Sequence, residues 1–170
     1  MVEPARRRLL AAAVLLGVGL GGFFDGILFH QILQLHHMLT TRRPAETLTA
    51  VEVNMFWDGM FHAFTWLVTV GGLAALWRAL ADPDAPRPPR TFVGGMLLGW
   101  GLFNVVEGVV DHHVLGLHRV VEGAPHPWWD LGFLASGVAL IALGTWLVRA
   151  DAPRPAPAPT ARTPAVAIRR

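Results

Sequence analysis

Cysteine, lysine and tyrosine are absent from this chain of 170 residues. Without cysteine, the chain cannot form disulfides, thiolate-bound metal sites, iron–sulfur clusters or a cysteine nucleophile. Without lysine, catalysis through a lysine Schiff base is excluded. The sequence also contains no Gly-x-Ser-x-Gly elbow and no phosphate-binding loop, which argues against a soluble hydrolase.

Charged residues are scarce as well. They make up 15% of the chain, and hydrophobic residues make up 53%, whereas a soluble domain usually has about a quarter charged residues. The basic residues are all arginines, they lie at the ends of apolar segments, and the net charge is only +2. Because there is no contiguous basic face, nucleic acid is not an expected partner, and the composition indicates the lipid bilayer instead.

Four apolar segments account for this composition. They run from about Leu9 to Met38, Val51 to Trp77, Phe92 to Leu117 and Trp128 to Val148. Each is long enough to cross a bilayer, which takes about 20 residues, and none alternates in the manner of a barrel strand. The sequence therefore predicts an all-α integral membrane protein. We expect a four-transmembrane-helix bundle that forms a single domain over residues 1–150, followed by a disordered Pro- and Ala-rich tail over residues 151–170.

The positions of the arginines predict the orientation of the segments. The termini and the second loop carry Arg6, Arg7, Arg8, Arg78, Arg87, Arg90, Arg149 and Arg154. The two loops on the opposite side carry only Arg42, Arg43 and Arg119. By the positive-inside rule, we expect both termini in the cytoplasm, in a multi-pass protein of the bacterial inner membrane.

The first and third segments are similar in sequence. Residues 25–30 align without gaps with residues 107–112, and residues 33–36 align with residues 115–118. The second and fourth segments share a weaker match, Trp57-Asp58 with Trp129-Asp130. This pattern predicts two parallel two-helix repeats, related by an axis along the membrane normal, with a site at the interface between them.

Many ionisable side chains lie within the apolar segments, where they are costly and usually mark function. At about 1.5 Å per helical residue from the nearest cytoplasmic arginine, Asp25, His62 and Glu107 all lie at a depth of about 25 Å. They therefore share one layer near the outer, periplasmic edge of a hydrocarbon core about 30 Å thick. On an α-helical wheel, His30 falls about 130° from Asp25, whereas Asp25 and His36 differ by only about 20°.

Imidazoles and carboxylates without thiolates suit iron, copper, zinc or manganese. The candidate ligands are Asp25, His30, Asp58, His62, Glu107, Asp111 and His112, with His36, His37 and His118 as an outer set. A metal ion typically takes three or four protein ligands, so these residues suffice for two ions. The sequence therefore predicts a dinuclear non-haem centre, with iron or copper favoured over zinc or manganese and an oxidoreductase favoured over a protein without turnover. Met38, beside the outer histidines, favours copper(I).

Several alternatives remain open at this point. One alternative is a protein that handles copper for oxidase assembly without turnover. The others are a haem b protein, a proton or ion relay, and a buried structural salt-bridge network. The carboxylates argue against an apolar haem pocket. The cytoplasmic halves of the helices are apolar, which argues against a continuous proton path. The cost of desolvating so many charged groups argues against a purely structural network. Among single residues, Asp130 is a candidate helix N-cap, Asn54 and Asn104 are candidate interhelical hydrogen-bonding residues, and His113 points away from Glu107.

Four strings of residues resemble one known family. They are Gly19–Gly26, His30–Met38, Trp57–His62 and Asn104–His113. They are similar to the bacterial predicted membrane proteins of the DUF2243 family, over about Leu9 to Val148. The resemblance implies the same membrane fold but no activity, since none is established for the family. Its members are said to lie near genes for a cytochrome oxidase assembly factor, which implies copper or haem handling and respiratory-oxidase assembly partners. The substrate and homo-oligomerisation stay open.

Overall fold

The computed structural model describes residues 2–151, with side chains from residue 4 onward. The regular structure in that range is entirely helical, in the order α1 (Val2–Asp25), η1 (Gly26–Ile32), α2 (Leu48–Leu80), α3 (Pro89–Glu107), η2 (Gly108–Val114) and α4 (Trp128–Ala150). The elements η1 and η2 are π-helices that continue α1 and α3. Four spans are long and apolar enough to cross a membrane, namely Pro4–Ile32, Leu48–Leu80, Pro89–Val114 and Trp128–Ala150. The predicted all-α membrane fold is therefore confirmed.

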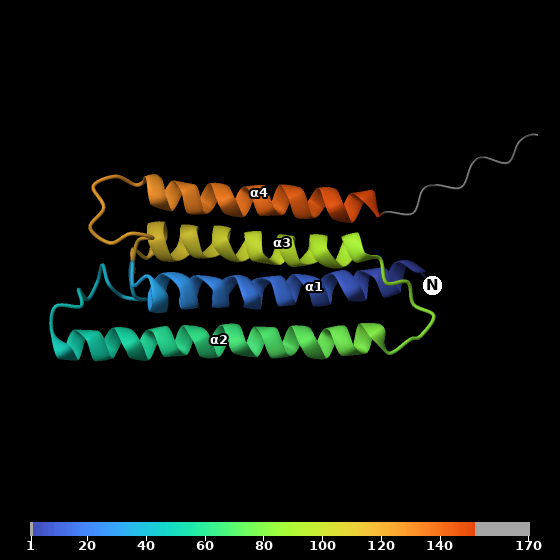
Figure 1. Cartoon of the computed structure of the whole chain (residues 1–170), viewed down its shortest axis with the longest axis horizontal. Coiled ribbons are helices and arrows are strands. Elements are labelled where there is room, and N and C mark those ends of the chain that lie inside the picture. Colours follow the sequence, from blue (N-terminus) through green and yellow to red (C-terminus); the bar gives the residue numbers. More distant parts are fainter. Residues whose placement is uncertain (1, 152–170) are drawn as a thin grey trace, which may run out of the picture.

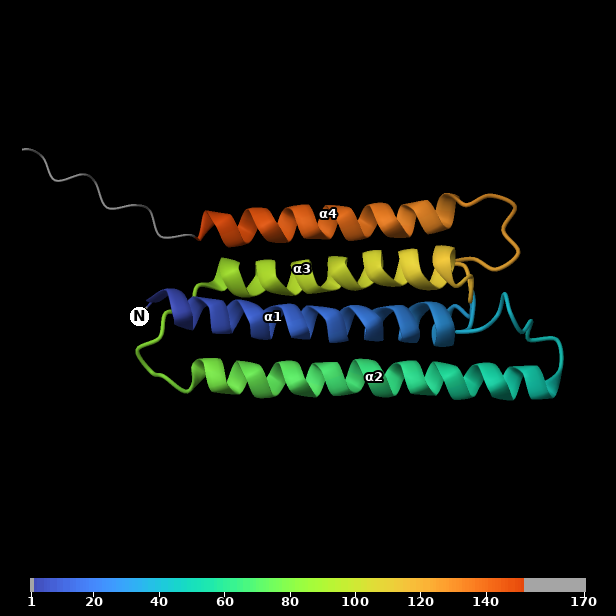
Figure 2. The same ribbon diagram turned by 180° about the vertical axis from the view of Figure 1, so that it is seen from behind.

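The four spans lie side by side in a row, in the order α2, α1, α3, α4 (Figure 1). The view from behind shows the same order (Figure 2). Within the described range, α2 packs on α1 and η1, α4 packs on α3 and η2, and the two outer helices do not touch each other. The predicted bundle is thus an open row. Its two central helices carry most of the buried surface, and the edge helices turn large apolar side chains outward.

Glycines allow the two central helices to approach closely. A Cβ atom on Gly17 of α1 would collide with the backbone of Met96, and one on Gly99 of α3 would collide with the backbone of Val14. Only glycine fits where two helix backbones come this near, which is a common way to pack membrane helices. The α1–α3 interface therefore holds both helices in a fixed register.

Both central helices change to π-helix at the residue that follows an acidic side chain. The change occurs at Gly26, after Asp25, and at Gly108, after Glu107. A π-helix repeats its hydrogen bonds from i to i+5, so residues five positions apart face the same way. Such segments are rare and are often found at functional sites.

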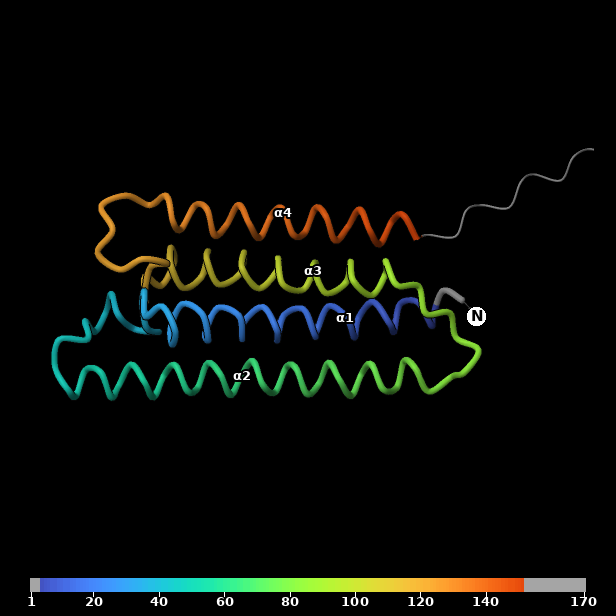
Figure 3. The backbone as a smooth tube through the Cα atoms, viewed as in Figure 1, coloured from blue at the N-terminus to red at the C-terminus, as the bar shows by residue number. Residues whose placement is uncertain are grey.

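Helical structure ends at Ile32 and Val114, earlier than the predicted ends of the first and third segments at Met38 and Leu117. Just beyond each end, one residue adopts a left-handed backbone conformation, Gln34 with φ 49° and Gly116 with φ 55°. Beyond each of these helix ends the chain turns back, as the tube in Figure 3 shows. The two loops, residues 33–47 and 115–127, then lie together at one end of the row, which we call the loop end.

The two loops are joined by backbone hydrogen bonds. Thr41 N donates to Leu117 O at 3.0 Å, and Glu122 N donates to Leu35 O at 3.2 Å. At the opposite end of the row lie the start of α1, the end of α4 and the connection from α2 to α3 (Figure 1). The placement of that end in the cytoplasm stays a prediction. Apart from its first residue, the tail predicted to be disordered lies outside the described residues.

Candidate metal centre

Six ionisable side chains meet at the loop end, between the two central helices. They come from three equivalent places in each half: the last residue of an α-helix, a π-helix and the loop that follows. We call them the central cluster: Asp25, His30, His36, Glu107, His112 and His118. None is more than 4% exposed. Their ligand atoms form three overlapping groups of three, each within 4.8 Å: His30 with His36 and His118, Glu107 with His112 and His118, and Asp25 with His30 and Glu107.

The π-helices bring the helical members of the cluster together. Asp25 and His30 are five positions apart, and Oδ2 of Asp25 lies 3.3 Å from Nε2 of His30. The prediction that these residues face different ways is therefore wrong, because it assumed α-helical geometry where the backbone follows a π-helix. Glu107 and His112 are likewise five positions apart, across the start of η2.

The two loop histidines stack on each other, with ring centroids 4.6 Å apart and ring planes at 3°. Each is held by the other loop. Nδ1 of His36 donates to Val120 O at 2.9 Å, and Nδ1 of His118 donates to Met38 O at 3.1 Å. A carbonyl oxygen can only accept, so the proton of each neutral ring lies on Nδ1 and the lone pair lies on Nε2.

Burial keeps both loop histidines neutral. It lowers the pKa of His36 to about 2, with further lowering by the nearby His118 and His30. Burial also lowers the pKa of His118 to about 3, helped by the neighbouring His112. Neutral imidazole is the form that binds metal ions, so the two rings are in the right protonation state for that role.

The histidines on the π-helices are oriented by carboxylates from the edge helices. Nδ1 of His30 lies 3.0 Å from Oδ1 of Asp58 on α2, and Nδ1 of His112 lies 3.2 Å from Oδ1 of Asp130 on α4. Met38 N donates to Asp58 at 2.8 Å. A carboxylate behind a histidine ring fixes the ring's orientation and holds the proton on the nitrogen beside it, which leaves the lone pair on the far nitrogen, as is usual behind metal-binding histidines.

Asp130 is held in the same manner as Asp58. It accepts a hydrogen bond from Val120 N at 2.9 Å and forms an ion pair with Arg119 at 2.9 Å. The residue at the N-cap of α4 is Pro127, so Asp130 does not cap the helix. The match between Trp57-Asp58 and Trp129-Asp130 was the sequence signal that could have assigned Asp130 this role beside His112.

The inward-facing atoms of the cluster have no hydrogen-bond partner. These buried atoms are Nε2 of His30, His36, His112 and His118, Oδ2 of Asp25, and Oε1 and Oε2 of Glu107. Nδ1 of His112 also lacks a hydrogen bond, although Asp130 lies 3.2 Å from it. A buried polar atom left without a partner costs about 1–3 kcal/mol. Imidazole nitrogens and carboxylate oxygens that face one another without hydrogen bonds fit a cation with nitrogen and oxygen ligands. The residues present therefore suit a transition metal.

Comparison with known proteins agrees with the membrane fold. The family model described as predicted membrane protein (DUF2243) matches residues 12–151. The chain belongs to the DUF2243 family. The match includes every residue of the central cluster and both carboxylates behind it. No curated protein and no solved structure matches the chain.

The other candidate ligands of this DUF2243 protein lie outside the central cluster. Asp58 stands behind His30, and His37 donates from Nδ1 to Asp58 at 2.7 Å. Nδ1 of His62 lies 2.7 Å from the backbone oxygen of Asp58. Asp111 is half-buried and lines a neighbouring pocket. A ligand role for these four residues stays a prediction.

The polar residues assigned to other roles also have defined places. Asn104 of α3 donates to Ser136 Oγ of α4 at 3.1 Å, an interhelical hydrogen bond of the predicted kind. Asn54 instead holds the first loop, since it accepts from Leu39 N and donates to Arg43 O. His113 is exposed, with its Nδ1 against Gly108 O.

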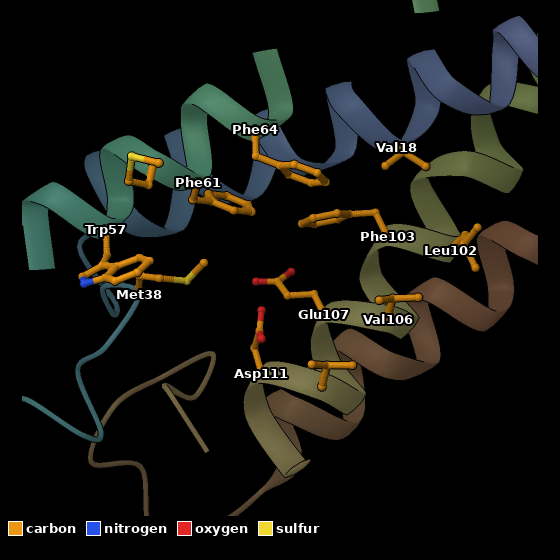
Figure 4. A pocket seen from close by; sticks show the side chains of 12 residues that line it. Val18, Met38, Trp57, Phe61, Phe64, Leu102, Phe103, Val106, Glu107 and Asp111 are labelled. Carbon is orange, nitrogen blue, oxygen red and sulfur yellow. The ribbon is translucent and has the colours of Figure 1, made fainter. Parts of the chain in front are cut away.

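A pocket adjoins the cluster on one side. It encloses about 440 Å³ between α1, α2 and α3. Figure 4 shows Glu107 and Asp111 pointing into it, surrounded by the aromatic rings of Trp57, Phe61 and Phe103. The cluster is therefore closed by protein on most sides but faces a cavity through Glu107.

Proposed function

We propose that this protein is an integral-membrane metalloprotein whose central cluster binds two iron or copper ions and carries out redox chemistry. One observation supports this proposal most strongly. Four buried histidines each have a carbonyl or carboxylate oxygen within 3.2 Å of Nδ1, and their Nε2 atoms lie beside two carboxylates without hydrogen-bond partners.

The donor set favours particular metals. Four imidazoles and two carboxylates without sulfur suit iron or copper, with zinc or manganese as alternatives. Six ligands suffice for two ions at three protein ligands each. The equivalent positions of the ligands in the two halves support a pair, and the ligand atoms of Glu107, His112 and His118 form one group within 4.8 Å of one another. Bound iron or copper would supply one-electron redox chemistry.

The protein's own residues prepare the site in two ways. The hydrogen bond to Asp58 keeps the proton of His30 on Nδ1, and Asp130 lies 3.2 Å from Nδ1 of His112. A carboxylate at this position makes the ring a stronger metal ligand through Nε2. Burial of all six cluster side chains excludes bulk water and strengthens every electrostatic interaction inside the cluster.

The alternatives fit less well. Copper transfer to another protein needs an accessible ligand, whereas every member of the cluster is buried. A haem needs a flat slot between its axial ligands, but the rings of His36 and His118 stack directly on each other. A proton relay needs polar groups along the row, and the buried hydrophobic residues of α1 toward its start are Ala5, Leu9, Ala12, Ala13 and Leu16.

The cellular setting is also part of the proposal. The arginine distribution places the loop end on the periplasmic side of a bacterial inner membrane. An assembly partner related to respiratory oxidases follows only from the family resemblance, and a homo-oligomer is left open. A redox reaction at the outer edge of the membrane fits both a protein with an assembly partner and a homo-oligomer.

Metal analysis of the detergent-purified protein tests the proposal. We expect about two iron or copper ions per chain, with a matching optical or paramagnetic signal. Glu107→Gln and His118→Ala should lose the metal, whereas His113→Ala and His126→Ala, which replace exposed histidines, should retain it. A metal-free protein that unfolds at the same temperature with and without added iron or copper would refute the proposal. A single copper ion that exchanges freely would favour copper handling instead.

A further inference from the structure

The pocket beside the central cluster opens through the membrane-facing surface. Its mouth is lined by exposed apolar side chains of α2 and α3: Trp57, Met60, Phe64, Leu102 and Val106. All of them lie within the spans Leu48–Leu80 and Pro89–Val114. Because α2 and α3 both pack on α1 but not on each other, the pocket lies in the groove between them. A molecule would therefore enter it sideways from the lipid.

The inner part of the pocket is aromatic. Phe61 and Phe103 form its buried wall, with ring centroids 6.0 Å apart, and Trp57 and Phe64 project from α2 beside them (Figure 4). Flat aromatic rings are favoured between such side chains, because offset and edge-to-face contacts add to the burial of apolar area. A cavity of about 440 Å³ is within the usual size range of small-molecule sites.

The pocket ends at two acids. Glu107 is 4% exposed, and both of its carboxylate oxygens lack a hydrogen-bond partner. Asp111 lies beside it and points the same way (Figure 4). No side chain in the described part of the chain donates a hydrogen bond to either acid within the pocket. An entering molecule must therefore bring its own donor, since a purely apolar one would cover the acids without satisfying them.

We propose that this pocket binds an uncharged, lipid-soluble phenol, whose ring lies among Trp57, Phe61 and Phe103 and whose hydroxyl donates to Asp111 or Glu107. Lipid access selects an apolar body, the aromatic wall selects a ring, and the acids select a hydroxyl donor. The inference deepens the proposed function and rests on it for the presence of a metal centre behind Glu107. Binding of the phenol itself is a separate property of the pocket.

Binding of 4-pentylphenol and its methyl ether, 4-pentylanisole, to the protein in lipid nanodiscs tests the inference. The two probes differ only in the hydroxyl donor. We expect the phenol to bind about tenfold more tightly, since the ether covers the acids without donating a hydrogen bond to them. Equal affinity for the two probes would overturn the proposal and indicate a lipid-chain site.

Two variants locate the bound probe. Val106→Trp fills the mouth and should weaken phenol binding by about tenfold or more, as expected for loss of both ring and hydroxyl contacts. The matched control is Val93→Trp, since Val93 is similarly exposed on the same helix but lies outside the pocket. Asp111→Leu should reduce the preference for the phenol over the anisole. Unchanged phenol affinity in the Val106→Trp variant would overturn the proposal.

Metal content and thermal unfolding are measured on the same samples. A folded wild type that holds the metal but shows no preference for the phenol refutes the pocket inference alone. A wild type without metal that binds the phenol in a Val106-dependent way supports the pocket inference and refutes the proposed metal centre. The two proposals therefore fail separately.

Discussion

The two halves of the molecule, α1 with α2 and α3 with α4, are alike around the central cluster. In one half His30 is backed by Asp58 from the edge helix, and in the other His112 is backed by Asp130. Each half also contributes one loop histidine that the opposite loop holds through a backbone carbonyl. The parts that would hold a metal thus follow the sequence alignment of the first and third segments.

The halves differ in the side chains beside the cluster. The positions aligned with Val106 and Asp111 are Phe24 and Phe29. Phe24 contacts Trp100 at a centroid distance of 5.0 Å and Phe29 at 6.1 Å, so aromatic rings cover this side. On the other side, the smaller Val106 and the acidic Asp111 line the open pocket.

This difference separates two tasks. The proposed metal pair needs about three ligands for each ion, and the six side chains of the cluster provide that number. Admitting a ligand requires an opening beside the cluster, and the pocket lies on the side lined by Val106 and Asp111.

The largest expected effect tests the equivalence of the halves. His36→Ala and His118→Ala each remove one ligand and the ring that stacks on its partner. Both should weaken metal binding by more than about a hundredfold. This exceeds the loss of about 10–100-fold that is usual when a residue hydrogen-bonded to a metal ligand is replaced. Metal content after purification measures this, with the exposed His126→Ala as control. If only one of the two variants loses metal, the halves are not equivalent.

The next effect concerns the carboxylates behind the π-helix histidines. Asp58→Asn and Asp130→Asn keep the size of the side chain but remove the charge that orients the ring. Each should weaken metal affinity by about 10–100-fold, measured by competition with a chelator. Asp84→Asn, in the exposed α2–α3 connection, is the control. Unchanged affinity in both variants would mean that these acids serve only to hold the loops.

A smaller effect follows from making the halves alike beside the cluster. Asp111→Phe introduces the residue that the other half has at the aligned position, Phe29. The pocket should lose its second acid and part of its volume, so phenol binding should fall by about tenfold. Metal content should stay unchanged, because Asp111 lies outside the cluster. Loss of the metal would instead make Asp111 a ligand, as the sequence pattern predicted.

The smallest effect concerns the partner of each supporting carboxylate. Asp58 pairs with His37, whereas Asp130 pairs with Arg119 at the aligned position. His37→Arg gives both carboxylates the same partner. Partly exposed ion pairs contribute only about 0–1 kcal/mol, so metal affinity should change by less than about fivefold. Chelator competition measures this change, and a larger loss would show that the imidazole of His37 has a specific role.

The sequence predicted the spans well, because hydropathy and length are local properties of the chain. It did not predict where helical structure ends, because the left-handed turns at Gln34 and Gly116 are single-residue backbone events. The helical wheel separated Asp25 from His30 for a similar reason. A change from α-helix to π-helix leaves no mark in composition but rotates every later residue about the axis.

The candidate site was predicted as a set of residue types at one depth. Six of the ten proposed ligands meet in the central cluster. The remaining four could not be separated from them by depth alone. Asp58, His62 and Asp111 share the layer of the helical cluster members, and His37 shares the outer set with His36 and His118. Their roles depend on tertiary contacts such as the 2.7 Å pair of His37 with Asp58, which spacing along a helix does not encode.

The exchange of hydrogen bonds between the two loops fixes the order in which the centre can be made during synthesis. His36 is held by Val120, and His112 is oriented by Asp130, which lies in the last helix. A nascent chain that has emerged only as far as α3 lacks both of these supports. The central cluster is therefore completed only after the fourth span has left the ribosome, and the proposed metal would be loaded late in biogenesis.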